Sequence, residues 1–356
     1  MPSGWRLRKR GGAKEVKSAE PEAAALRRAC GVDIVWVIQG PNIWRGETIS
    51  MSPINRREFL RKSTAGLASI PALAAISCST TPQPTAPIQP AAPVGPPLGL
   101  PIGLELYTVR DQCEKDFEGT LKQIAAIGYQ TVEIYDFYGK TAADVKKLLD
   151  DNGLKAPAGH WLLPKLRNSL PKCIDDAKTL GCEYLVMPIL DPPERKTFGQ
   201  FKRHAEFFNK VGEKCKQAGL SFGYHNHNYE FKKYDDTTVF DYLLSALDPQ
   251  LVSIEMDCFW VVHAGYDPVT YLEKYPGRFP ILHIKDLKAG YAPTTEKDDK
   301  VGLFAEVGHG TIDWKRIFTA APKGGMKCYF VEQDFFERPP LESVKMSYDY
   351  LKKLAV

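Results

Sequence analysis

Residues 220–231 read LSFGYHNHNYEF, and the rest of the chain can be read outward from this stretch. Its first half alternates like a β-strand, whereas residues 225–231 hold two histidines, two asparagines, a tyrosine and a glutamate. Burying His225, His227 and Glu230 without partners would cost several kcal/mol each. We therefore expect a metal ion, a polar substrate or a dense hydrogen-bond network at the end of this strand.

Three later runs repeat this pattern of apolar residues with one polar side chain near the C-terminal end. They are IEMDCFW with Asp257, ILHIKDL with His283 and CYFVEQDF with Glu332. Eight such runs alternate with amphipathic segments of helical spacing, which is the pattern of βα units and a parallel sheet. The predicted strands are GLELYTV (103–109), TVEIYDF (131–137), KAPAGHW (155–161), YLVMPIL (184–190), LSFGYHN (220–226), LVSIEMD (251–257), PILHIKD (280–286) and KCYFVEQ (327–333).

Eight βα units within residues 98–356 fit one closed (β/α)8 TIM barrel. An open doubly wound sheet is the alternative, but no Gly-rich phosphate loop follows the first predicted strand. In a TIM barrel the C-terminal strand ends carry the site, so the polar residues above should meet at one rim.

The composition narrows the class of protein. The 356 residues are 44% hydrophobic, which is enough for a large core. The net charge of +4 is uneven, because residues 1–97 hold 13 Lys/Arg and 6 Asp/Glu, leaving 34 and 37 for the remainder. The predicted domain is therefore slightly acidic, and no nucleic-acid partner is expected. The eight cysteines include no C-x-x-C pair, so we expect neither a disulfide framework nor a zinc ribbon.

The first part of the chain is organised differently. Residues 1–50 show no sustained periodicity of hydrophobic residues, and we interpret them as an upstream extension that is either not translated or disordered. Residues 51–78 resemble a twin-arginine export signal, with INRREFL before a short apolar run; an ordinary basic helix start is the alternative. The run ends in AISC, a lipobox-like sequence in which Cys78 would be lipidated. With the Pro-rich linker 79–97, this predicts a periplasmic domain, residues 98–356, tethered to the membrane.

The polar strand ends predict a metal site. They come from the fifth to eighth predicted strands, so they would line one contiguous half of the rim. Three carboxylates and one imidazole suit one divalent cation such as Mn²⁺, Mg²⁺, Co²⁺ or Zn²⁺, which would also keep the carboxylates ionised. The alternative, unrelated polar residues that cap strands, would explain one or two of them. The predicted ligands are Glu230, Asp257, His283 and Glu332.

The ordered motifs YHNHNYEF, MDCFWVVHAGYDPVTYLEKYPGRF, LHIKDL, VGHGTIDW and YFVEQD resemble the sugar phosphate isomerase/epimerase family of xylose-isomerase-like barrels, which includes inosose dehydratases and ketose 3-epimerases. The resemblance covers residues 100–354 and implies the same barrel, with the four predicted ligands as its metal site. One position departs from the family pattern. In ketose 3-epimerases the first metal glutamate stands at the strand end, where this chain has Tyr224 or His225.

Other residues are candidate substrate contacts. Lys285 follows His283 by two positions on the same predicted strand, so both side chains should face the mouth. There Lys285 could stabilise an enediolate oxygen. A salt bridge with Asp286 is the alternative. Trp260 would form an apolar platform for a sugar ring or else pack in the core. The remaining candidate contacts are His160, Glu133, His225 and His309.

The favoured hypothesis is a divalent-metal-dependent sugar isomerase or epimerase, which removes a proton next to a carbonyl through a metal-bound enediolate. His227, Glu230 and Glu332 are the candidate acids and bases. One alternative is a keto-glycoside lyase or hydrolase that expels a leaving group by β-elimination at the same site. Another is a non-catalytic sugar-binding lipoprotein. A barrel that cuts DNA at abasic sites fits less well, because the domain is slightly acidic. The expected partner is a small sugar, keto-sugar or glycoside.

Overall fold

The computed structural model describes residues 35–38, 44–47, 95–296 and 301–356. The predicted export signal, its lipidation site Cys78 and most of the predicted linker lie outside the described residues and stay predictions. None of the described helices is both long enough and apolar enough to span a membrane.

The chain divides into two units, which we describe separately. In the first unit, β1 (Val35–Ile38) and β2 (Trp44–Glu47) pair as a two-stranded antiparallel ladder. The second unit, residues 86–356, holds everything else that the structure describes.

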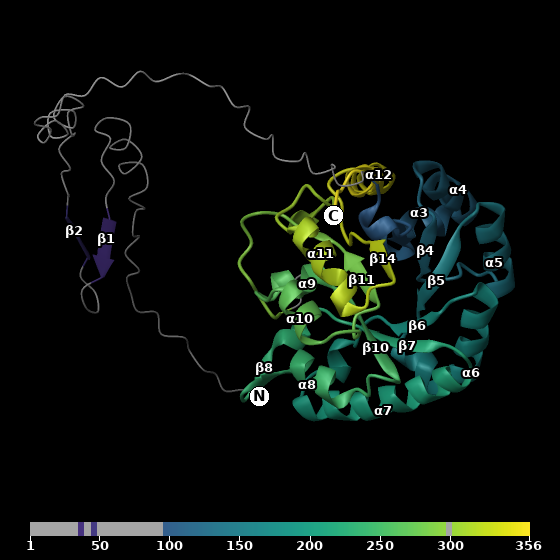
Figure 1. Ribbon diagram of the computed structural model, residues 1–356, viewed down its shortest axis with the longest axis horizontal. Helices are drawn as coiled ribbons and strands as arrows, with labels where there is room; N and C mark the ends of the chain where they lie inside the picture. Colours follow the sequence, from purple (N-terminus) through teal and green to yellow (C-terminus); the bar gives the residue numbers. More distant parts are fainter. Residues whose placement is uncertain (1–34, 39–43, 48–94, 297–300) are drawn as a thin grey trace, which may run out of the picture. The chain divides into compact units, whose positions relative to one another are not determined.

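Eight parallel strands of the second unit form a closed barrel (Figure 1). In order around the barrel they are β3 (Gly103–Glu105), β4 (Thr131–Ile134), β5 (Lys155–His160), β6 (Tyr184–Met187), β7 (Ser221–His225), β10 (Val252–Asp257), β11 (Ile281–Ile284) and β14 (Cys328–Val331). The prediction of a (β/α)8 TIM barrel is confirmed, and each of the eight predicted segments contains one of these strands.

Helices surround the barrel and connect its strands (Figure 1). They are α3 (Arg110–Lys115), α4 (Phe117–Ile127), α5 (Ala142–Asp151), α6 (Leu163–Leu180), α7 (Phe198–Gln217), α8 (Val239–Ala246), α9 (Cys258–His263), α10 (Pro268–Lys274), α11 (Trp314–Gly324) and α12 (Pro340–Leu351). Two short antiparallel ladders extend the loops: β8 (Lys233–Tyr234) with β9 (Thr237–Thr238), and β12 (Asp286–Leu287) with β13 (Phe304–Ala305). The six described cysteines are free thiols, five of them buried.

The first two barrel strands are shorter than predicted because carboxylates at their ends turn the chain. Glu105 accepts a hydrogen bond from Tyr107 N at 3.2 Å, and Leu106–Val109 form a 3-10 helix, η2, instead of continuing β3. After β4, Asp136 accepts one from Tyr138 N at 3.0 Å. Such local bonds compete with the strand ladder.

A glycine allows the barrel to close between its first and last strands. Gly103 on β3 pairs with Phe330 on β14. A Cβ at this position would lie 2.6 Å from Tyr329 O and 2.5 Å from the Phe330 ring, so a larger residue would push the two strands apart.

The barrel interior has an apolar layer with polar side chains above it. The apolar layer consists of Ala158, Tyr184, Val186, Ile281 and Phe330. His160, His283 and Glu332 each follow one of these residues by two positions on the same strand face. Because side chains alternate along a strand, all three also point into the barrel, nearer its C-terminal end.

Candidate active site

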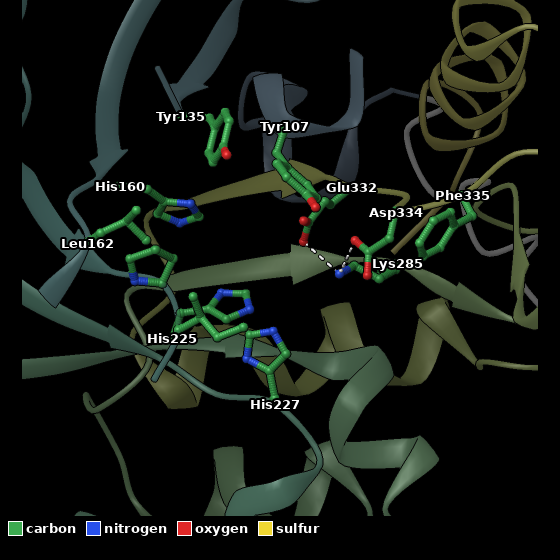
Figure 2. A pocket seen from close by; sticks show the side chains of 12 residues that line it. Tyr107, Tyr135, His160, Leu162, His225, His227, Lys285, Glu332, Asp334 and Phe335 are labelled. Atoms are coloured by element: carbon green, nitrogen blue, oxygen red, sulfur yellow. Dashed lines mark hydrogen bonds and ion pairs between the residues drawn. The ribbon is translucent and has the colours of Figure 1, made fainter. Parts of the chain in front are cut away.

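A cavity of about 200 Å³ lies at the C-terminal ends of the barrel strands (Figure 2). Its polar lining consists of His160, His225, His227, Lys285, Glu332 and Asp334. Its apolar lining consists of Tyr107, Tyr135, Leu162, Pro188, Ile189 and Phe335. This is the end of the barrel at which TIM-barrel enzymes carry their sites.

Four buried side chains from β7, β10, β11 and the end of β14 converge at this cavity. The ligand atoms of His225, Asp257, His283 and Glu332 all lie within 4.8 Å of one another. Three of these residues belong to the predicted metal set, and His225 stands where the sequence analysis placed Glu230. We call these four side chains the mouth set.

The mouth set fits a divalent cation. It offers two imidazole nitrogens and two carboxylates, a mixture that Zn²⁺ and similar ions accept. Asp257 Oδ1 accepts a hydrogen bond from Trp260 N at 3.1 Å. The buried Oδ2 accepts no directed hydrogen bond within the described part of the chain, and His225 Nε2 lies 3.6 Å from it. An ion at this oxygen would share it with the Lys285 ammonium, which lies 3.2 Å away.

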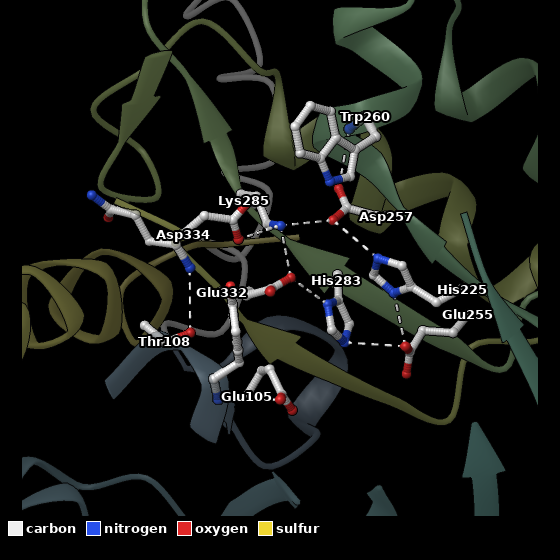
Figure 3. Close-up of polar contacts among 12 residues, drawn as sticks. Glu105, Thr108, His225, Glu255, Asp257, Trp260, His283, Lys285, Glu332 and Asp334 are labelled. Carbon is white, nitrogen blue, oxygen red and sulfur yellow. Dashed lines mark hydrogen bonds and ion pairs between the residues drawn. The ribbon is translucent and has the colours of Figure 1, made fainter. Parts of the chain in front are cut away.

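Lys285 places a positive charge against the same carboxylates (Figure 3). Its Nζ lies 2.8 Å from Glu332 Oε2, 3.2 Å from Asp257 Oδ2 and 2.9 Å from Asp334 Oδ1. Burial would lower the pKa of Lys285, but the three carboxylates raise it well above its usual value. Burial would likewise raise the pKa of Glu332, but Lys285 and His283 hold it well below the usual range. The ammonium and the Glu332 carboxylate are therefore both charged.

Glu255 lies one layer deeper and contacts three imidazoles. Its Oε2 is 2.9 Å from His160 Nε2, 2.9 Å from His225 Nδ1 and 3.4 Å from His283 Nε2. Glu133 Oε2 adds a second contact with His283 Nε2 at 2.6 Å. Both carboxylates are fully buried. In His225 and His283, they contact the ring nitrogen that points away from Asp257 and Glu332.

These contacts orient the two imidazoles of the mouth set. The deeper nitrogens, His225 Nδ1 and His283 Nε2, face carboxylates and so carry the protons. The opposite nitrogens face the mouth, where His283 Nδ1 lies 2.8 Å from Glu332 Oε2. A carboxylate behind a ligating histidine is the usual way in which proteins fix its tautomer.

The two imidazoles differ in charge. Burial, with the repulsion of His283, lowers the pKa of His225, so this ring is neutral and able to ligate. Burial would also lower the pKa of His283, but Glu255 and Glu133 raise it well above the usual value. An ion at His283 Nδ1 would therefore displace a proton.

The floor of the barrel also holds carboxyl oxygens that accept no hydrogen bond from the described part of the chain, and burial raises the pKa of Glu105 and Glu133 above its usual value. Glu105 Oε2, Glu133 Oε1 and Glu255 Oε1 are buried and accept no hydrogen bond within the described residues. His160, His225, Glu255 and His283 form a second group of ligand atoms within 4.8 Å, below the first. Both groups reach the cavity wall, the mouth set through His225 and Glu332 and the second group through His160 and His225. The mouth set has two carboxylates and the second group has one, so the mouth set better balances the charge of a divalent ion.

The structure does not bring Glu230 together with the other three predicted ligands, which lie with His225 instead. Its buried carboxylate accepts a short hydrogen bond from the Tyr224 hydroxyl and one from His227 N at 2.9 Å. Burial raises the pKa of Glu230 to about 8. This side chain holds the loop that carries His227, because the strand ends at His225 and the 3-10 turn Tyr229–Phe231 folds Glu230 back.

The other predicted substrate contacts have different surroundings. His160 and His225 line the cavity, as does Lys285. Glu133 and Trp260 are fully buried and do not line it. The Trp260 ring instead packs against the ring of His227, with centroids 5.4 Å apart.

Asp286 organises the VGHGTIDW loop and does not pair with Lys285. It accepts hydrogen bonds from Gly308 N at 2.9 Å, Gly310 N at 3.2 Å and Trp314 Nε1 at 2.9 Å. His309, between the two glycines, is exposed and lines a separate groove beside α12. It is not among the cavity residues.

The sequence analysis did not name Asp334, Glu105 or Tyr107, nor any other residue of the apolar lining. Asp334 follows Glu332 by two positions, so the argument that was applied to Lys285 would have found it. Glu105 could have been found in the same way, at the end of the first strand. Tyr107 lies in a 3-10 turn that was predicted as strand, and no sequence signal placed it at the cavity.

The closed barrel and its polar C-terminal rim define the class, a TIM barrel with an acid and imidazole site at the strand ends. A family model described as xylose isomerase-like TIM barrel matches residues 121–354, and the chain belongs to this family. The resemblance inferred from the motifs is thereby confirmed, and with it membership of a superfamily of sugar-processing enzymes.

Several known proteins are similar to this chain. Inosose dehydratase of Lacticaseibacillus casei is 25% identical over 269 residues, which cover 67% of this chain and 89% of that protein. A solved sugar phosphate isomerase/epimerase from Parabacteroides distasonis is 29% identical with a TM-score of 0.57, covering 79% of this chain and 97% of that one. The IolI protein, solved with a zinc atom, shares the fold at 15% identity and a TM-score of 0.57, covering 70% and 96%.

Proposed function

We propose that this chain is a divalent-metal-dependent enzyme that removes a proton from the carbon next to a carbonyl group of a sugar. The observation that carries this proposal is the mouth set, His225, Asp257, His283 and Glu332, at a cavity that also exposes His227 and Lys285. The names of the relatives, inosose dehydratase and sugar phosphate isomerase/epimerase, support a sugar or inosose as the substrate.

The mouth set would hold the ion, which when bound withdraws electron density from a carbonyl and makes the neighbouring C–H more acidic. Lys285 places a fixed positive charge at the cavity, which favours negative charge on a substrate oxygen through space, because its three N–H groups already point at carboxylates. Because three carboxylates already hold its Nζ, this charge needs no reorganisation during the reaction.

His227 is the best-placed group to take the proton. It lines the cavity, and its ring stacks on Tyr229 and Trp260 with centroids 5.3 and 5.4 Å away. Glu230 accepts a hydrogen bond from the backbone N–H of His227 at 2.9 Å, which holds the loop that carries this ring. Glu332 is the second candidate, although membership of the mouth set occupies its carboxylate.

The fate of the proton separates two reactions. Returning it to a neighbouring carbon, or to the opposite face, gives an isomerase or epimerase. Expelling a leaving group gives a lyase, and the similarity to inosose dehydratases favours this second candidate, since a dehydratase eliminates water. Both reactions share the removal of the α-proton, so one assay can test the common step.

Solvent exchange tests the common step directly. The metal-loaded chain is incubated in D₂O with ketoses, inososes and keto-glycosides, and deuterium at the α-carbon is followed by NMR. His227→Ala should slow exchange about 10² to 10⁴-fold, the usual contribution of a positioned base, while bound metal stays constant. His309→Ala is the matched control, because this exposed histidine lies outside the cavity. Undiminished exchange in His227→Ala would remove His227 from the mechanism. Sugar binding without exchange in the wild type would favour a binding protein.

A further inference from the structure

We propose that the cavity contains an apolar subsite beside the sugar, so that the substrate is a glycoside carrying an apolar, preferably aromatic, group. The proposal rests on the proposed function for the position of the sugar and adds the nature of the group attached to it. Five side chains form this subsite, which we call the apolar rim: Tyr107, Tyr135, Leu162, Ile189 and Phe335.

The apolar rim surrounds the polar groups of the cavity. In Figure 2, Tyr107 and Tyr135 lie together on one side, Leu162 lies beside His160, and Phe335 lies beside Asp334. Lys285 and Glu332 occupy the space between them. A sugar held by the polar groups would therefore have apolar side chains on several sides, where the cavity opens to solvent.

The apolar rim is open to solvent. Leu162 is 42% exposed, and within the described residues Leu98 and Tyr291 are the other large hydrophobic side chains that are similarly exposed. The other four rim residues are half-buried. Apolar surface left in water at a cavity mouth gains about 25 cal/mol per Å² when a ligand covers it.

The aromatic part of the rim is held rigidly. The Arg110 guanidinium stacks over the Tyr107 ring at 4.2 Å, and its two terminal nitrogens donate to Tyr107 O at 2.8 Å and to Asp334 O at 2.9 Å. The edge of Tyr135 packs against Tyr107 with centroids 4.8 Å apart. A ligand that stacks on this surface therefore loses little free energy to ordering the side chains.

The charges of the cavity argue against a phosphorylated substrate. Two cations line the cavity, and both already face carboxylates. The Lys285 ammonium serves three of them, and His160, whose pKa the buried glutamates raise to about 10, lies 2.9 Å from Glu255 Oε2. The Glu332 carboxylate, whose pKa Lys285 and His283 hold well below the usual range, would repel a phosphate dianion. A free sugar would satisfy the polar groups but leave the rim in water, whereas an apolar substituent pointing outward covers it.

The test compares two ligands that differ only in this substituent. Methyl and phenyl 3-oxo-glucosides are titrated into the metal-loaded full chain, and their dissociation constants are measured by calorimetry. We expect the phenyl compound to bind on the order of tenfold more tightly, from the additional apolar area buried. Leu162→Ala should weaken phenyl binding about threefold to tenfold and leave methyl binding unchanged. Leu98→Ala is the matched control, since this leucine is 41% exposed and does not line the cavity.

Each outcome decides the proposal. Equal affinities, or no binding of the phenyl compound, overturn it. Equal losses for both ligands in Leu162→Ala would mean that the rim contacts the sugar ring itself, which also overturns it. Turnover without a phenyl preference would leave the proposed function intact and reject the subsite. A phenyl preference without turnover or α-proton exchange would support the subsite and reject the proposed reaction.

Discussion

Replacing Glu255 by glutamine should weaken divalent-metal binding by about 10 to 100-fold, the range found when the group behind a metal-ligating histidine is removed. Glu255 is not a member of the mouth set and does not line the cavity, yet its Oε2 lies 2.9 Å from His225 Nδ1 and 3.4 Å from His283 Nε2. It thus contacts both imidazoles of the mouth set. We therefore expect its loss to act through their orientation.

The magnitude follows from the contacts that glutamine cannot replace. An amide oxygen can accept from the imidazoles, but without the charge that roughly doubles the strength of such bonds. Its NH₂ group would also face the crowded floor of the barrel. Losing 10 to 100-fold in affinity corresponds to about 1.4 to 2.8 kcal/mol, which is the scale of one or two such hydrogen bonds. Glu133 keeps its contact with His283 Nε2, so binding should weaken without being abolished.

The assay is a metal titration in competition with a chelating dye, with thermal unfolding as a check that the variant folds. Glu255→Asp separates position from charge, because it keeps the carboxylate and withdraws it by one methylene. Glu306→Gln is the matched control, a buried glutamate that accepts from Ser343 Oγ at 2.8 Å and does not line the cavity. Affinity within about twofold of wild type in Glu255→Gln would refute the orientation argument.

Three further predictions concern charge. Metal affinity should rise with pH, up to about tenfold per unit for each proton displaced, because carboxylates raise the pKa of His283 and the ion must displace its proton; a pH-independent affinity in calorimetry would contradict this. Burial raises the Glu230 pKa from 4.5 to about 8. The contribution of this group to the free energy of unfolding is therefore fully present below pH 4.5 and is lost as the pH rises from 4.5 to about 8. In urea titrations Glu230→Gln should flatten this loss relative to wild type, and parallel pH profiles would argue against it. Lys285→Met should destabilise the metal-free chain by about 3 to 5 kcal/mol, as expected when a buried charge loses its partner. Added metal should then raise Tm more in this variant than in wild type, and equal shifts would show that the ion does not replace the ammonium at Glu332.

The site was predictable from the sequence where it depends on strand ends. Asp257, His283 and Glu332 each stand near the C-terminal end of an apolar run, on the strand face that points into the barrel. The structure brings all three together. Glu230 lies apart from these three because the alternation of side chains does not extend past the end of the strand. Once β7 ends at His225, the turn that follows decides where Glu230 points.

The sequence by itself determined the number, order and facing of the barrel strands, because the alternation of side chains along a strand is a local property. Only the tertiary structure decided which side chains meet. The parallel register sets Glu255 opposite His225 on β7 and Asp257 opposite His283 on β11. That register depends on the closure and stagger of the whole barrel, which no single segment encodes. For this reason the carboxylates beneath the imidazoles, and the ring nitrogens that face the mouth, could be assigned only from the folded chain.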